Sequence, residues 1–216
     1  MAGLQIYGSS TLAEVEASGS IRTIEAPRGQ QYCVGEITGT IAAALAANSS
    51  VFAMRLDPSS SLRAFIDSIE IKYTTIVAYT TAVTAGRRLA VFRGSGAAAS
   101  GGTAIATAVP KSTVFAASEF DAASGGDMRI AATGALTVTG ITYETAPIAV
   151  MPLVHVGAAG AYVEHEFHFD KSDGAPIQLE PGQVLAIRNP AAMDAAGTWQ
   201  LSVEVHWREA AALTLA

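Results

Sequence analysis

The strongest structural signal in the chain is TWQLSVEVHW, which occupies residues 198–207. From Trp199 to Trp207, apolar side chains take every second position and polar side chains take the positions between them. Successive side chains of a β-strand point to opposite faces, so this alternation predicts an antiparallel strand with one buried face. We expect this strand to be central. Its buried side chains should be Trp199, Leu201, Val203, Val205 and Trp207, with Ser202 and Glu204 more exposed.

Further strand patterns precede this segment. Alternating or β-branched runs predict strands at 68–73, 89–92, 137–143, 163–169 and 183–189. A Gly-, Ala-, Ser- and Thr-rich region between about 94 and 127 predicts a long loop with short strand or helix fragments. Many strands with turn signals and no long amphipathic helix predict an all-β fold, an antiparallel β-sandwich of jelly-roll type.

The 216 residues divide into an N-terminal arm (1–35), a sandwich domain (36–209) and a C-terminal tail (210–216). The spacing of the apolar residues in the arm supports neither a stable helix nor one clean strand. Such a segment cannot offset its ordering entropy of about 1–2 kcal/mol per residue alone. We therefore predict that it binds a partner as an added strand or a clasp, through Leu4, Ile6, Tyr7, Leu12, Val15, Ile21 and Ile24. The alternative is an arm that packs on its own sandwich as an edge strand.

Charge patterning excludes two classes of partner. The net charge is −6, and the longest basic run is the pair Arg87–Arg88. A nucleic-acid binder needs a basic stripe and a polybasic membrane anchor needs a basic cluster, so we expect neither partner. No signal peptide and no apolar stretch of about 18 residues is found. Only 15% of the residues are charged. This fraction indicates either surface hidden in an assembly or an alanine-rich composition from a GC-rich genome.

The histidines raise the possibility of a cupin-like metal site. All four lie in the last third of the chain: His155, His165, His168 and His206. A cupin needs two histidines two residues apart, whereas His165 and His168 are three apart and point to opposite faces of a regular strand. His168 shares a face with Glu164 and Glu166, and a β-bulge could still assemble a site there. We expect a solvated polar face and no metal.

Three other features suggest chemistry less strongly. Residues 94–99 fit a dinucleotide-binding glycine pattern, but Ser100-Gly101-Gly102 would break the helix that this motif requires. Cys33 is the only cysteine, and we interpret it as a small packed residue rather than a nucleophile. Trp199 and Trp207 share a face with aliphatic residues, which favours a core role over a ligand platform. We therefore predict no catalytic residues and no cofactor.

Parts of the sequence resemble a group of tailed-bacteriophage virion structural proteins. The resemblance is carried by residues 179–190 (LEPGQVLAIRNP) and 197–207 (GTWQLSVEVHW), with weaker likeness at 84–94 and 153–157. It spans about residues 37–208 and leaves out the arm. It implies a β-sandwich that decorates a capsid or belongs to a tail, and it carries over no functional residue.

Composition, strand pattern and resemblance together predict a non-enzymatic capsid decoration, or cement, protein. It would bridge subunits of the major capsid protein on the virion surface, form a homotrimer, and be made in the host cytoplasm. Many modest contacts repeated around a shell resist the outward pressure of packaged DNA through avidity. The alternatives are a tail- or fibre-associated protein that binds a host glycan, and a cupin-like metalloenzyme.

Overall fold

The computed structural model describes residues 5–8, 11–15, 21–25, 30–42, 44–80, 86–154, 157–169, 176–193 and 196–211, the first three ranges as backbone only. The fold is all-β. The one helix within these ranges is a short 3-10 turn, η1 (Ala122–Ser124). No helix in the described part of the chain is long and apolar enough to cross a membrane.

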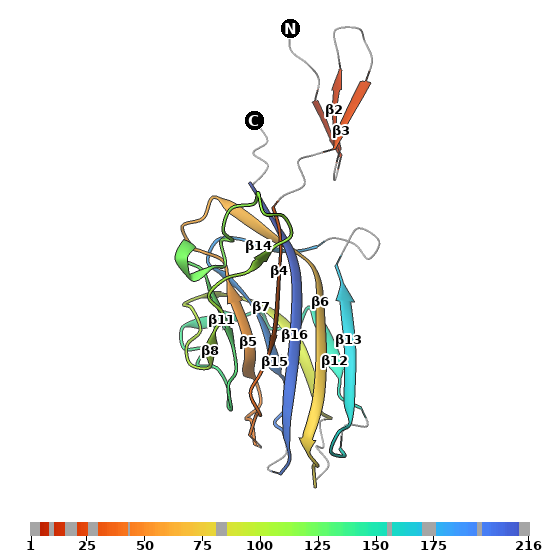
Figure 1. Ribbon diagram of the computed structural model, residues 1–216, viewed down its shortest axis with the longest axis vertical. Helices are drawn as coiled ribbons and strands as arrows, with labels where there is room; N and C mark the ends of the chain where they lie inside the picture. Colours follow the sequence, from red (N-terminus) through yellow and green to blue (C-terminus); the bar gives the residue numbers. More distant parts are fainter. Residues whose placement is uncertain are drawn as a thin grey trace.

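Two antiparallel sheets pack face to face (Figure 1). The six-stranded sheet contains, in order, β13 (Tyr162–His168), β6 (Leu62–Val77), β16 (Thr198–Ala211), β4 (Gln30–Ile37) and β9 (Val109–Pro110), with β14 (Ile177–Leu179) also paired to β6. The seven-stranded sheet contains β11 (Ile141–Tyr143), β7 (Arg88–Gly96), β15 (Gln183–Asn189), β5 (Ser49–Arg55), β10 (Asp127–Ile130) and β8 (Thr103–Ala104), with β12 (Ala149–Pro152) also paired to β7.

The strand order confirms the predicted sandwich and gives it jelly-roll topology. One sheet holds β13-β6-β16-β4, and the facing sheet holds β12, β7, β15 and β5 side by side. Most connections between these long strands cross from one sheet to the other. The first long strand of the sandwich, β4, pairs with the last strand, β16. This is the double Greek-key arrangement of a jelly roll.

The central strand is β16, as predicted from its alternation. It lies between β4 and β6, and its five predicted core side chains are at most 1% exposed, whereas Ser202 is half-buried and Glu204 exposed. Trp199 stacks on Tyr73 with ring centroids 5.0 Å apart, and Trp207 stacks on Tyr32 at 5.8 Å. Burial of each large side chain stabilises the fold by about 1.5–3 kcal/mol.

The outer face of the seven-stranded sheet is largely covered. A second, small core lies there, formed by Ala53, Ala99, Leu136, Val184 and Ala186. Backbone bridges between Ser100 and Thr137 and between Ser50 and Leu136 hold the covering segment in place. The outward-facing residues of β7 are buried as well, with Ala90 1% and Phe92 6% exposed. The Tyr143 ring and the Arg188 guanidinium lie against Phe92. Between the end of β7 at Gly96 and the start of β10 at Asp127 runs the expected long connection, whose regular elements are β8, β9 and η1.

The N-terminal region differs from the extended arm that we expected. Its described residues form three short antiparallel strands, β1 (Gln5–Gly8), β2 (Thr11–Val15) and β3 (Ile21–Glu25). Within the described ranges, none of these strands pairs with a strand of the sandwich. Figure 1 shows the small sheet beyond the end of the sandwich at which β4 begins.

The boundary expected at residue 35 needs correction. Strand β4 begins at Gln30 and pairs with β16 from Glu209 to Ser202. Its residues Tyr32 and Val34 lie in the main core at 1% and 3% exposure. The sandwich therefore starts at residue 30. Its last strand continues to Ala211, slightly past the expected end at 209.

Candidate functional site

The structure places most of the predicted attachment residues in the N-terminal sheet. Ile6, Tyr7, Leu12, Val15, Ile21 and Ile24 all lie on β1–β3, while Leu4 lies outside the described residues. In the backbone register Leu12 pairs with Tyr7 on one side and with Ile24 on the other. Their side chains are outside the described part of the chain. The backbone pairing of the sheet therefore places these residue positions next to one another.

An acidic row crosses the outer face of the six-stranded sheet. Glu166 of β13 lies opposite Glu70 of β6, which lies opposite Glu204 of β16. Like charges directly opposite one another across strands repel. Burial, followed by the negative charges of Glu164 and Glu204, raises the pKa of Glu70. This face favours basic over acidic partners.

Two histidines lie beside this row. His168 Nε2 is 3.3 Å from a Glu166 carboxylate oxygen, and His206 Nε2 is 2.6 Å from Glu204 Oε1. β13 pairs with β6 residue for residue from Tyr162 to His168, without a bulge. His165 consequently faces the other way and contacts the Phe167 ring at 4.4 Å between centroids. The described ranges contain no cluster of three metal-ligating side chains suited to a metal ion, and His155 lies outside them.

Five exposed apolar residues lie at strand ends or in loops at one end of the sandwich. They lie at the finish of β4 and β6, at the start of β13 and just after β12, far from the N-terminal sheet (Figure 1). We call this set the apolar end; its members are Ile37, Ile76, Val77, Val154 and Tyr162, between 40% and 65% exposed. We consider them candidates for an interaction surface, which an exposed apolar patch would mark.

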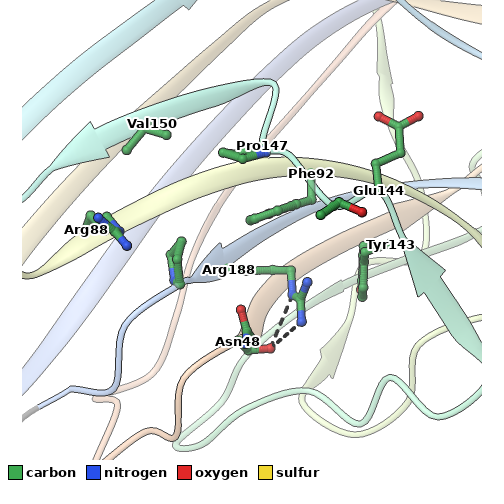
Figure 2. Close-up of a pocket in the computed structure, with 10 residues that line it drawn as sticks. Asn48, Arg88, Phe92, Tyr143, Glu144, Pro147, Val150 and Arg188 are labelled. Carbon is green, nitrogen blue, oxygen red and sulfur yellow. Dashed lines mark hydrogen bonds between the residues drawn. The ribbon is translucent and has the colours of Figure 1, made fainter. Parts of the chain in front are cut away.

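A groove lies on the outer face of the seven-stranded sheet, above β7 and β15 (Figure 2). Its volume is about 540 Å³, which falls within the usual range of ligand sites. The guanidinium of Arg188 lies 4.1 Å from the ring centroid of Tyr143 and 5.1 Å from that of Phe92. Its Nε and Nη2 donate to the Asn48 carbonyl oxygen at 3.2 and 2.7 Å. These contacts fix the cation in the groove. We call this site the Arg188 groove.

Burial shifts the titration of both groups that meet at the centre of the groove. It lowers the pKa of Arg188, and it raises the pKa of Tyr143, whose hydroxyl lies 3.3 Å from the Ser50 hydroxyl. The raised pKa keeps the Tyr143 phenol neutral near neutral pH, and the guanidinium of an arginine stays cationic in proteins.

The glycines that fit a dinucleotide motif allow β11 and the Tyr143 ring of the groove to pack closely against β7. A Cβ on Gly94 would lie 2.8 Å from Tyr143 Cδ1, so only glycine lets the ring lie against β7. Gly96 has φ +125°, and a Cβ there would meet the Gly140 carbonyl at 2.1 Å. No helix follows the motif within the described residues, which continue as bends and short strands. The pattern therefore reflects close packing of β11 on β7.

Cys33 departs in part from its predicted role. It is free and half-buried on the outer face of β4, between the buried Tyr32 and Val34. Trp199 and Trp207 lie in the core, as predicted.

Sequence reasoning did not find the groove. Arg88, Phe92, Tyr143 and Arg188 come from three strands that are distant along the chain. A signal was present, because Arg188 interrupts the apolar strand 184–187 immediately before Asn189-Pro190.

No protein-family model matches this sequence, and no curated protein matches it.

Proposed function

We propose that this protein is a structural subunit of a tailed-phage virion, a capsid decoration protein that bridges major capsid subunits. The resemblance of 179–190 and 197–207 to virion structural proteins supports the class, and the jelly-roll sandwich suits it because this fold recurs in capsid proteins. In this proposal the sandwich stands on the shell and the N-terminal strands attach it.

The separate N-terminal sheet is the observation that carries the proposal. Three strands of four or five residues are close to the minimum for a stable sheet, and the described strands of the sandwich do not pair with them, so a hydrophobic partner would stabilise them further. A groove or an open strand edge on a neighbouring subunit would supply that partner by strand addition. Repeated around a shell, such weak contacts gain strength through avidity.

Self-association is the second part of the proposal. The apolar end offers Ile37 and Tyr162 at 57% and 65% exposure, and only 15% of the residues of the chain are charged. Contact between copies would remove this apolar surface from water. We propose a homotrimer, because closed rings of three fit the three-fold and quasi-three-fold points of icosahedral shells.

Binding to particles tests the proposal. The purified full chain should sediment with shells built from the major capsid protein of the phage that encodes it. A variant lacking residues 1–28 should remain in the supernatant. Equal sedimentation of the two proteins, or failure of the full chain to bind, would contradict the assignment.

A further inference from the structure

We infer that the Arg188 groove binds a carboxylate-bearing sugar, such as a uronic acid unit of a polysaccharide. This inference does not depend on the virion assignment, because it rests only on the side chains that line the groove.

The groove carries positive charge without internal compensation. Arg188 makes its contacts with a backbone carbonyl and two aromatic rings, and Arg88 is exposed. Within the described ranges neither arginine forms an ion pair. Glu144, the one carboxylate of the lining, is neutralised by Arg93 at 2.7 Å. The groove is thus a local cationic site on a protein of net charge −6. An anionic group is the complement of an unpaired guanidinium, and Arg188 and Arg88 each offer one to the groove.

The rest of the lining calls for more than a bare anion. Pro147 and Val150 present apolar surface along the edge above Arg88 (Figure 2), and the ring of Phe92 lies beneath. Asn48 and Thr145 add neutral donors and acceptors at the rim. A hexuronic acid has all three complements: a carboxylate for an arginine, hydroxyls for the polar rim and an apolar C–H face for Pro147 and Val150. Phosphate or acetate offers only the first of these.

The shape of the site also favours a unit of a longer chain. The groove has a volume of about 540 Å³ and is open to solvent. It lies on the outer side of the seven-stranded sheet and not between the two sheets. Arg188 is held by the Asn48 carbonyl and the Tyr143 ring, so little side-chain ordering remains to be lost on binding. A polysaccharide can lie along such a groove and be recognised through one of its acidic sugar units.

Ligand-observed NMR titration of the full chain tests the inference. The probes are D-glucuronate and D-galacturonate, with D-glucose, D-galactose, acetate and inorganic phosphate for comparison. We expect the uronates to bind at least about tenfold more tightly than the neutral sugars and the two simple anions. Arg88→Gln and Arg188→Gln should each weaken uronate binding by about the same factor. Arg208→Gln, a half-buried arginine of the other sheet, should leave it unchanged.

Several results would overturn the inference. Equal affinity for D-glucose would show that the carboxylate is not recognised, and equal affinity for phosphate would reduce the groove to a bare anion site. Unchanged uronate binding in Arg88→Gln would exclude the groove, since Arg88 is exposed and its replacement leaves the fold intact. The thermal midpoint of Arg188→Gln separates loss of the site from loss of the fold.

Discussion

The indole Nε1 of Trp207 donates a 2.9 Å hydrogen bond to the carboxylate of Glu209, two residues further along the central strand. The same carboxylate accepts the Ser118 hydroxyl at 2.6 Å and the Glu119 backbone N–H at 3.0 Å. Glu209 is only 2% exposed. One buried carboxylate therefore joins the long 94–127 connection to the middle of the six-stranded sheet.

Replacement of Glu209 should reveal a pH-dependent contribution to stability. Burial raises the pKa of Glu209 above its ordinary value of 4.5, although its three donors oppose the shift. The folded state therefore binds the proton more tightly than the unfolded state. This contribution is fully present below the unfolded pKa and is lost as the pH rises through the folded pKa. Urea unfolding measures the free energy of unfolding of wild type and of Glu209→Gln. The difference, wild type minus variant, should fall as the pH rises from 4.5. A constant or rising difference would refute this.

Truncation of the same residue should cost more. Glu209→Ala leaves the Trp207 and Ser118 donors buried without an acceptor, at about 1–3 kcal/mol for each. Urea unfolding at pH 7 should place Glu209→Ala well below Glu209→Gln in stability. If both variants match wild type, the carboxylate does not hold the connection.

Trp199→Ala should destabilise the fold by about 3–5 kcal/mol, because it removes a fully buried side chain and leaves a cavity. Trp199→Phe is the control: it keeps a ring against Tyr73, and within the described residues the lost indole N–H has no hydrogen-bond partner. Chemical denaturation should give a clearly smaller loss for Phe. Equal losses would mean that Trp199 is not a packing residue.

Gly94→Ala should destabilise the sandwich by about 1–3 kcal/mol through overpacking, because the new methyl group meets Tyr143 and the Thr142 carbonyl, each at 2.8 Å. Gly35→Ala is the matched control in a strand, since a Cβ there meets nothing within 4 Å. Differential scanning calorimetry compares the two. A neutral Gly94→Ala would show that the Tyr143 ring does not rest on β7.

Mass photometry of the purified chain should show a trimer that Ile37→Asp converts to monomer, because a charge at the apolar end opposes burial there. Val109→Asp places the same charge on a residue of similar exposure, 60%, on β9. It should leave the trimer intact. A wild-type protein that is only monomeric, with no three-fold cluster on particles, would contradict the proposed assembly.

Deletion of residues 1–28 should leave the thermal midpoint nearly unchanged. The cut falls before Gln30, where β4 begins, so the Tyr32–Trp207 stack and the pairing of β4 with β16 are kept. Unfolding of the truncated protein would mean that the N-terminal sheet is part of the sandwich core. A stable variant that fails to bind shells would assign the segment to attachment.

Two long strands of the sandwich were predicted well from local pattern. Alternation located β16, which has one buried face, and its core side chains. Turn residues located β15 from Gln183 to Asn189 even though both of its faces are buried. Alternation failed to distinguish the faces of β7, because its outward residues Ala90 and Phe92 are also buried, Phe92 against Tyr143 and Arg188 from distant strands. The three N-terminal strands were missed because four- and five-residue strands with scattered apolar residues carry little periodic signal.

Local pattern offers only one sign of the groove, Arg188, which ends the apolar run 184–187. The arginines and aromatic rings of the groove meet only because β7 and β15 are neighbours and Gly94 lets Tyr143 close over them. Which strands become neighbours depends on the topology of the whole sheet, and no local stretch of sequence shows it.

A cryo-EM reconstruction of the virion tests the central proposal most directly. We predict density for the sandwich in three-fold clusters on the outer capsid surface, with residues 5–25 lying against the major capsid protein and the sandwich standing away from it. Density for this chain in the tail alone, or a capsid-bound sandwich whose N-terminal strands touch no capsid subunit, would contradict the account.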